Sequence, residues 1–317
     1  MADRGLLDLA VNRIPGLMSR EKLILCEKFD RDEDFYLLSR GDVERIINRR
    51  LKKPWTMDAL RAQAEKDAAL ARLRGISYVA YGDEGYPPLL RELYDPPALL
   101  FYRGALPDRE RPLAAVVGTR RPSAAAALQA YDIGREFGRA GLSVVSGLAL
   151  GIDALAHRGN IEGGAATVAV LGCGLDRAYP VSNRGLAQRV VETGGVLLSE
   201  YSPGTEPFKW NFPARNRIIA GLARGVLIVE APERSGALIT AQLALDMGRD
   251  LLVASAGAAS PLGAGTRKLL DQGARLLERA ADMFEEWGVA LPGDERVENG
   301  TDLALGLARS LNIVCEE

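Results

Sequence analysis

One ten-residue segment, residues 208–217, concentrates side chains suited to binding a nucleic acid. Its sequence, Phe-Lys-Trp-Asn-Phe-Pro-Ala-Arg-Asn-Arg, alternates aromatic rings with cations and amides, and it precedes a helix predicted over residues 218–223. Aromatic faces stack on unpaired bases while arginines bind phosphates, a combination typical of single-strand binding. The alternative interpretation is a buried aromatic hinge flanked by solvated arginines, and the segment alone does not separate the two.

Glycine and small hydroxyl residues recur in the turns that follow five predicted strands. Such turns let backbone N–H groups and helix N-termini approach an anion closely, and arginines nearby could bind phosphate oxygens in pairs. A polyphosphate ligand spread over several turns is one interpretation, but glycine-rich turns occur throughout strand–helix folds. The sequence holds neither the G-x-G-x-x-G fingerprint nor a Walker A motif, which disfavours an NAD enzyme or a P-loop ATPase. The turns begin at Gly118, Ser146, Gly172, Glu200 and Glu230, and the arginines are Arg120, Arg121, Arg215 and Arg217.

The residues that could serve catalysis or bind a metal are few. His157 is the one histidine, and although Asp153 and Ser146 lie near it in sequence, no G-x-S-x-G elbow precedes a helix. Cys173 lies in a glycine-rich turn without an evident base, and the three cysteines form no C-x-x-C pair. We therefore predict no catalytic residues, no metal site and no cofactor.

A repeated strand–helix pattern must position these turns. Continuous apolar strands that alternate with helices indicate a parallel sheet covered on both faces. The predicted fold class is therefore α/β, a doubly wound, Rossmann-like parallel sheet, extended at its start by the short strands and Pro-rich turns of residues 76–112. The predicted strands are residues 113–117, 142–145, 167–171, 196–198, 226–229, 251–254 and 275–277.

The two ends of the chain differ from this pattern. Residues 1–75 show helical spacing of apolar residues and predict a small all-helical (SAM/helix-hairpin-helix-like) domain. In it, residues 14–18 (Ile-Pro-Gly-Leu-Met) are similar to a helix-hairpin-helix turn, and a basic cluster at residues 45–53 is either a solvated face or a DNA-backbone contact. Residues 76–288 form the predicted Rossmann-like domain, and residues 289–317 a short acidic tail too small for a winged helix.

Charge is distributed unevenly along a chain whose formal net charge is −2. The last forty residues, 278–317, hold 3 of the 40 Lys+Arg and 10 of the 42 Asp+Glu, so the rest of the chain is mildly basic. The sparse cysteines fit a reducing cytoplasm, and no signal peptide or run of about 18 apolar residues is present. We expect a cytoplasmic protein with no membrane partner.

Six stretches together resemble one family, the DNA processing protein A (DprA/Smf) family. Their order and spacing agree with it over about residues 76–280. The resemblance implies an extended Rossmann domain that binds single-stranded DNA, forms a homodimer and loads the RecA recombinase onto incoming strands in natural transformation, with single-strand-binding protein as a further partner. It implies no catalytic activity. The stretches are residues 117–120, 146–157, 179–180, 198–200, 212–222 and 229–241.

The resemblance also assigns candidate DNA contacts to residues in the turns and in the aromatic segment. Three departures accompany it: Ala256-Gly257 stands where members commonly have Pro-Gly, a C-terminal winged helix is missing, and Met18 replaces the second glycine of the hairpin turn. The competing hypotheses are a nucleotide-processing, phosphoribohydrolase-like enzyme, whose Pro-Gly-Gly-x-Gly-Thr-x-x-Glu loop is absent, and a scaffold that has lost the DNA site. The candidate contacts are Gly118, Thr119, Arg120, Ser146, Gly147, Lys209, Arg215, Asn216, Arg217, Ser235 and Gly236.

Overall fold

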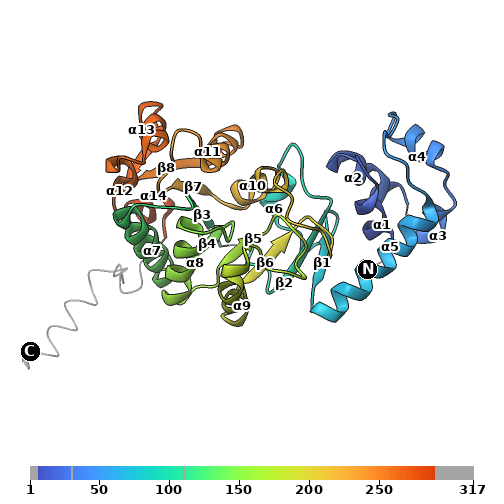
Figure 1. The fold of residues 1–317 in the computed structure, drawn as a ribbon, viewed down its shortest axis with the longest axis horizontal. Coiled ribbons are helices and arrows are strands. Elements are labelled where there is room, and N and C mark those ends of the chain that lie inside the picture. Colours follow the sequence, from blue (N-terminus) through green and yellow to red (C-terminus); the bar gives the residue numbers. More distant parts are fainter. Residues whose placement is uncertain (1–5, 30, 110, 290–317) are drawn as a thin grey trace, which may run out of the picture.

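A single nine-stranded sheet forms the centre of the protein in the computed structural model, which describes residues 6–29, 31–109 and 111–289 (Figure 1). The strand order is β1-β2-β6-β5-β4-β3-β7-β8-β9. Strand β2 is antiparallel to both of its neighbours, and every other neighbouring pair is parallel. The predicted Rossmann-like α/β class is confirmed. The strands are β1 (Ser77–Ala80), β2 (Leu99–Gly104), β3 (Leu113–Val117), β4 (Ser143–Ser146), β5 (Val168–Val170), β6 (Val196–Ser199), β7 (Gly225–Ile228), β8 (Asp250–Ala254) and β9 (Arg275–Leu277).

Helices cover both faces of the sheet because successive residues of each central strand point to opposite sides. In β3, Ala115 and Val117 pack with α10 and α11, whereas Ala114 and Val116 pack with α7, α8 and α14. Figure 1 shows these two layers on opposite sides of the strands. The helices of this part are α6 (Pro88–Arg91), α7 (Ala124–Arg139), α8 (Ile152–Glu162), α9 (Arg184–Glu192), α10 (Asn211–Leu222), α11 (Gly236–Asp246), α12 (Ser255–Ala259), α13 (Ala264–Asp271) and α14 (Ala281–Trp287), with a 3-10 turn at Val181–Asn183.

The direction in which the chain winds reverses next to β3. From β3 the chain adds β4, β5 and β6 on one side, and it then returns to add β7, β8 and β9 on the other. In open parallel sheets the crevice at such a reversal, beyond the carboxyl ends of the strands, is where ligands bind. The topology therefore predicts a ligand site at the ends of β3 and β7. The turns that follow these two strands contact each other there, because the Thr119 N–H donates to Glu230 O at 2.8 Å.

The N-terminal helices confirm the predicted helical region. The longest, α5, begins after Thr56, whose hydroxyl caps the Ala59 N–H, and ends at Gly75 with a φ of 61°. The hairpin-like turn is held by Arg49, which donates to Gly16 O at 2.7 Å and pairs with Glu21 at 2.6 Å. Arg49, predicted as part of a basic surface, thus has a structural role. The other helices are α1 (Leu7–Arg13), α2 (Ser19–Lys28), α3 (Asp32–Tyr36) and α4 (Arg40–Ile46).

Helix α10 begins earlier than predicted, and this matters for the site. The prediction placed its start at residue 218, but the helix runs over Asn211–Leu222. The physical reason is that Pro213 lies in the first helical turn, where a proline removes no hydrogen bond that the helix needs. Residues 211–217 of the aromatic segment are therefore helical.

The other departures concern the C-terminal part. The N–H of Ala256 donates to Gln129 Oε1 at 2.8 Å, an interaction that a proline at this position could not make. The predicted acidic tail, residues 289–317, lies outside the described residues apart from Val289. Between residues 6 and 289, none of the described helices combines the length and the apolar character needed to cross a bilayer.

Candidate nucleic-acid interface

A cleft of about 720 Å³ opens at the carboxyl ends of β3 and β7, where the winding of the sheet reverses. Eight of the eleven predicted contacts line it, drawn from the turns after β3 and β7 and from the segment around the start of α10. Its lining also includes Arg121, Tyr179, Phe212 and Arg234, which the predicted list omits. The eight are Gly118, Thr119, Arg120, Lys209, Arg215, Asn216, Ser235 and Gly236.

Positive charge dominates the cleft. Five of its lining residues are cations, whereas Asp153 is the one carboxylate among them. Arg120, Lys209 and Arg234 are exposed, so their charges face solvent, where a polyanion would arrive. Charges of one sign that line a concave surface raise the local concentration of ligands of the opposite charge.

Glu230 holds the arginine-bearing turn in place. Its buried carboxylate accepts hydrogen bonds from the Ser123 N–H and hydroxyl, both at 2.8 Å. Ser123 in turn caps α7 by accepting from the Ala126 N–H. The turn at residues 118–123 is thereby fixed to the end of β7, and Arg120 projects from a rigid base. Glu230 lies in one of the sequence stretches that resemble the family. Its contact with Ser123 could not be predicted, because the two residues are far apart in the sequence.

Arg215 lies in the floor of the cleft. It is 5% exposed, and its Nη1 donates to Val170 O at 2.5 Å. Burial lowers the pKa of Arg215 to about 10, with Asp153 opposing the shift, so it stays charged at neutral pH. Burial likewise raises the pKa of Asp153, which the Arg215 charge and the Gly147 and Ala149 N–H groups oppose. Within the described residues, the buried Arg215 Nε has no hydrogen-bond partner.

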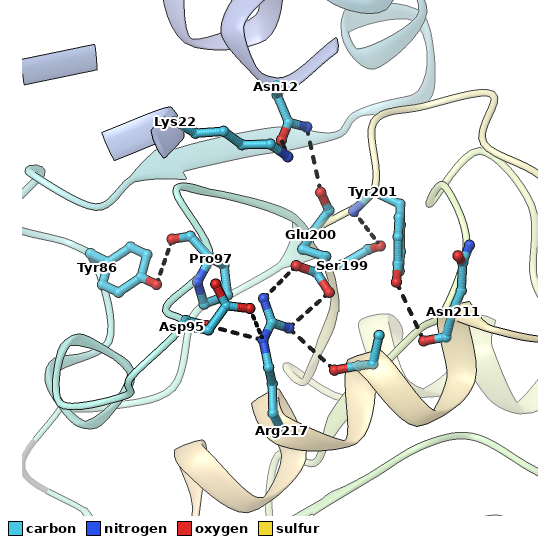
Figure 2. A network of polar contacts seen from close by, with 11 residues as sticks. Asn12, Lys22, Tyr86, Asp95, Pro97, Ser199, Glu200, Tyr201, Asn211 and Arg217 are labelled. Atoms are coloured by element: carbon cyan, nitrogen blue, oxygen red, sulfur yellow. Dashed lines mark hydrogen bonds and ion pairs between the residues drawn. The ribbon is translucent and has the colours of Figure 1, made fainter. Parts of the chain in front are cut away.

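Three predicted contacts do not line the cleft. The Ser146 hydroxyl is fully buried and donates to Val116 O at 2.6 Å. Gly147 lies against the Arg215 guanidinium, where any β-carbon would lie 2.8 Å from Arg215 Cζ. Arg217 points away from the cleft and forms an ion pair with Glu200 at 2.7 Å (Figure 2).

Two aromatic rings line the cleft, and two more lie close by in the sequence. The Phe212 ring packs against Tyr179 with a centroid distance of 5.4 Å, and Arg120 Cζ lies 5.9 Å from the Phe212 centroid. Phe208 and Trp210 are both exposed. The alternative of a buried aromatic hinge with solvated arginines is therefore wrong for this segment, because aromatic rings are exposed while Arg215 is buried.

The comparisons with known proteins identify the family. Residues 77–288 match the family model for DNA recombination-mediator protein A. The chain belongs to this family, DprA/Smf. DNA processing protein DprA of Bacillus subtilis is 40% identical over 220 residues, which cover 69% of this chain and 73% of the relative. The pneumococcal protein, from Streptococcus pneumoniae, is 43% identical over 205 residues, or 65% of this chain and 72% of the relative.

Solved structures of DprA proteins have the same fold. The X-ray structure of the Streptococcus pneumoniae protein superposes with a TM-score of 0.73 at 34% identity and covers 90% of this chain and 98% of its own. DNA processing protein A from Helicobacter pylori, which binds single-stranded DNA, superposes with a TM-score of 0.60 at 30% identity, covering 67% and 95%. The family match ends at residue 288, so it covers the sheet and its helices, whereas the pneumococcal structure extends over most of the chain.

His157, considered above as part of a triad, is instead a buried residue of this DprA member. Its Nδ1 lies 2.7 Å from Thr167 Oγ1, and the ring is fully buried. Burial lowers the pKa of His157 to about 3 from its ordinary 6.5, and the Arg215 charge adds to the shift. The folded protein therefore keeps this imidazole neutral across the range in which the unfolded chain becomes protonated.

We expect this histidine to make the protein less stable in mild acid. Its contribution is complete above pH 6.5 and is lost as the pH falls, because only the unfolded chain then binds the proton. Between pH 7.5 and 5.0 the free energy of unfolding should drop by about 2 kcal/mol from this one group. Urea unfolding at the two pH values measures it, and His157→Gln should flatten the dependence. NMR of the single imidazole provides a direct check, since a titration midpoint near pH 6.5 in the folded protein would contradict it.

Proposed function

We propose that this DprA/Smf member binds single-stranded DNA in the cleft at the ends of β3 and β7. The observation that carries the proposal is the lining of the cleft, in which five cations face one carboxylate beside an aromatic cluster. Cations that track a backbone and rings that stack on bases are the two components of single-strand binding. The ssDNA binding of the Helicobacter pylori relative supports the same assignment.

In this proposal the predicted contacts fall into three groups. Arg120 and Lys209 bind phosphates, and the Asn216 amide binds phosphate or base, while the backbone of the turns at Gly118–Thr119 and Ser235–Gly236 approaches the strand closely. Ser146, Gly147 and Arg215 build the floor beneath it, with Arg215 contributing its buried charge. Arg217 supports α10 from the opposite side. The N–H of Ala237, capped by Ser235 at 3.2 Å, marks the start of α11 at the rim of the cleft.

We propose further that the bound strand is passed to RecA, so that the protein acts as a recombination mediator in natural transformation. The family match supports this role. A homodimer, action on strands coated with single-strand-binding protein, and a place in the cytoplasm complete the proposal. The proposal includes no chemical reaction on the DNA. In it, the side chains of the cleft bind phosphates and bases, and none of them acts as a nucleophile.

Binding of oligo(dT) by the full chain tests the proposal. We expect a dissociation constant below about 1 μM at low salt, with log K falling by about 0.7 per neutralised phosphate for each unit of log[salt]. Fluorescence anisotropy at four salt concentrations measures both quantities. Absence of salt-dependent binding at low ionic strength would refute the proposed function.

RecA-driven strand exchange tests mediation separately from binding. Single strands are first coated with single-strand-binding protein, and the full chain is then added before RecA. We expect the wild type to restore strand exchange. Arg120→Ala should fail to do so at the protein concentration at which the wild type is sufficient. Equal recovery with and without the protein would refute the mediator role and leave DNA binding intact.

A further inference from the structure

Two exposed aromatic rings, on either side in sequence of the cleft residue Lys209, form a parallel stack. The Phe208 and Trp210 rings lie 4.7 Å apart between centroids with an interplanar angle of 4°. They are 45% and 70% exposed, respectively. Aromatic side chains bury 150–250 Å² each when they pack in a core, so a pair left in solvent forgoes a large stabilisation. Because the two exposed rings stack in parallel, the pair presents a flat aromatic surface to solvent.

The geometry leaves one ring face open. Phe208 covers one face of the Trp210 indole, yet most of that side chain is exposed, so its opposite face must be in contact with solvent. A flat ligand placed there would continue the stack as a third ring. Parallel, offset stacking is a favoured geometry for aromatic pairs, and every nucleobase offers such a face.

Lys209 connects this stack to the cleft. It lies between the two aromatic residues in sequence, and its side chain lines the cleft. A strand whose phosphate is bound by Lys209 therefore brings the neighbouring base to the level of the rings. A cation of the cleft that lies between the two stacked rings in sequence favours an unpaired base over an apolar peptide as the partner.

The stack is held rigidly, as a binding platform requires. The Phe208 carbonyl accepts from the Asn211 N–H at 3.0 Å, and the buried Asn211 amide donates to Gly172 O at 3.0 Å. Figure 2 shows the Tyr201 hydroxyl donating to the Asn211 carbonyl, which ties the first turn of α10 to the segment after β6. A partner would therefore find the rings already ordered and lose little entropy in binding them.

We propose that the Phe208–Trp210 pair is a base-stacking platform that extends the cleft by one unpaired nucleobase of the bound strand. The inference rests on the proposed function, because it needs a strand whose phosphates lie in the cleft. It adds a subsite for one more base to a cleft whose own lining holds cations and the Tyr179 and Phe212 rings.

Two oligomers of equal length and phosphate count separate these contributions: (dT)12 and a twelve-unit strand of abasic sites. Trp210→Leu should weaken (dT)12 binding by about 5- to 100-fold, with an unchanged salt slope, and should leave abasic-strand binding as in the wild type. Trp210→Phe keeps a ring and should keep most of the affinity. Tyr94→Leu, a change of the same kind at a residue that is 81% exposed beside Arg20, is the matched control and should change neither affinity.

Tryptophan fluorescence gives a second readout. Of the three tryptophans, Trp55 is half-buried and Trp287 is 6% exposed, so quenching by a stacked base should come from Trp210. We expect (dT)12 to quench the wild type and to leave Trp210→Phe unquenched. Equal (dT)12 affinity of wild type and Trp210→Leu, without quenching, would overturn the platform alone. A wild type that binds neither oligomer would instead refute the proposed function.

Discussion

Arg120→Ala is expected to weaken binding of oligo(dT) by about 10- to 100-fold, because hydrogen bonds to charged groups contribute about 1.5–3 kcal/mol. Arg120 is exposed at the rim of the cleft, on a turn fixed by Glu230. Removing it should also reduce the log–log salt slope by about 0.7, since one phosphate is no longer neutralised. Anisotropy titrations with (dT)12 at several salt concentrations measure both effects. The folded state should be unaffected, because the side chain is not buried.

Arg139→Ala is the matched control for this variant. Arg139 is exposed in the last turn of α7, at the opposite end of the helix that follows Arg120. A helix of 16 residues spans about 24 Å. Both substitutions remove one positive charge, so a general loss of charge would weaken binding equally in both. An unchanged salt slope in Arg120→Ala would show that this arginine does not contact phosphate.

Most of the fold followed from patterns in the sequence. The seven predicted parallel-sheet strands all occur, and each of their ends lies within one residue of its predicted position. This agreement has a physical cause, since a strand buried on both faces must be continuously apolar. The sequence also indicated the turns after five of these strands as ligand-binding candidates, because a parallel sheet brings its strand ends to one edge. The selection of the turns after β3 and β7 depends on the strand order and on the cleft.

The sequence prediction began helix α10 at residue 218 instead of Asn211. For that reason it could not give the directions in which the side chains of residues 211–217 point. Residues two apart on a helix do not face each other, so Arg215 and Arg217 cannot both enter one cleft once residues 211–217 are helical. An extended segment before residue 218 allowed both to bind phosphate. Which of the two faces the cleft depends on how α10 packs against the sheet, and that packing involves residues distant in sequence, such as Val170 and Glu200.

The second large effect that we expect concerns Arg217, which connects three parts of the chain. Its Nη1 and Nη2 donate to the Glu200 carboxylate at 2.8 and 2.7 Å, and its Nε lies 3.3 Å from Asp95 Oδ2 (Figure 2). Burial alone would lower the pKa of Arg217, but the charges of Glu200 and Asp95 outweigh it and raise the pKa above its ordinary value. The Asn12 side-chain amide, which belongs to the N-terminal helices, donates a hydrogen bond to the Glu200 carbonyl.

Arg217→Ala should therefore destabilise the protein by about 3 kcal/mol, as found when one partner of a buried ion pair is removed. The side chains of Arg217 and Glu200 are 13% and 17% exposed, so the carboxylate left behind would be poorly solvated. Urea unfolding followed by circular dichroism measures the change. Arg217→Met with Glu200→Gln should recover part of the loss, because that pair leaves no uncompensated charge.

The DNA-binding behaviour of the Arg217 variant separates support of α10 from contact with the strand. Under conditions where the variant stays folded, its salt slope with (dT)12 should equal that of the wild type, because no phosphate contact is lost. Its affinity should fall only as far as α10 loses its position, because that helix places Arg215 and Asn216 in the cleft. A slope reduced by about 0.7 in a variant of undiminished stability would mean that Arg217 leaves Glu200 to bind phosphate. The paired measurements on Arg120 and Arg217 thus separate two roles. Substitution of Arg120 should lower the affinity for DNA, whereas substitution of Arg217 should lower the free energy of unfolding.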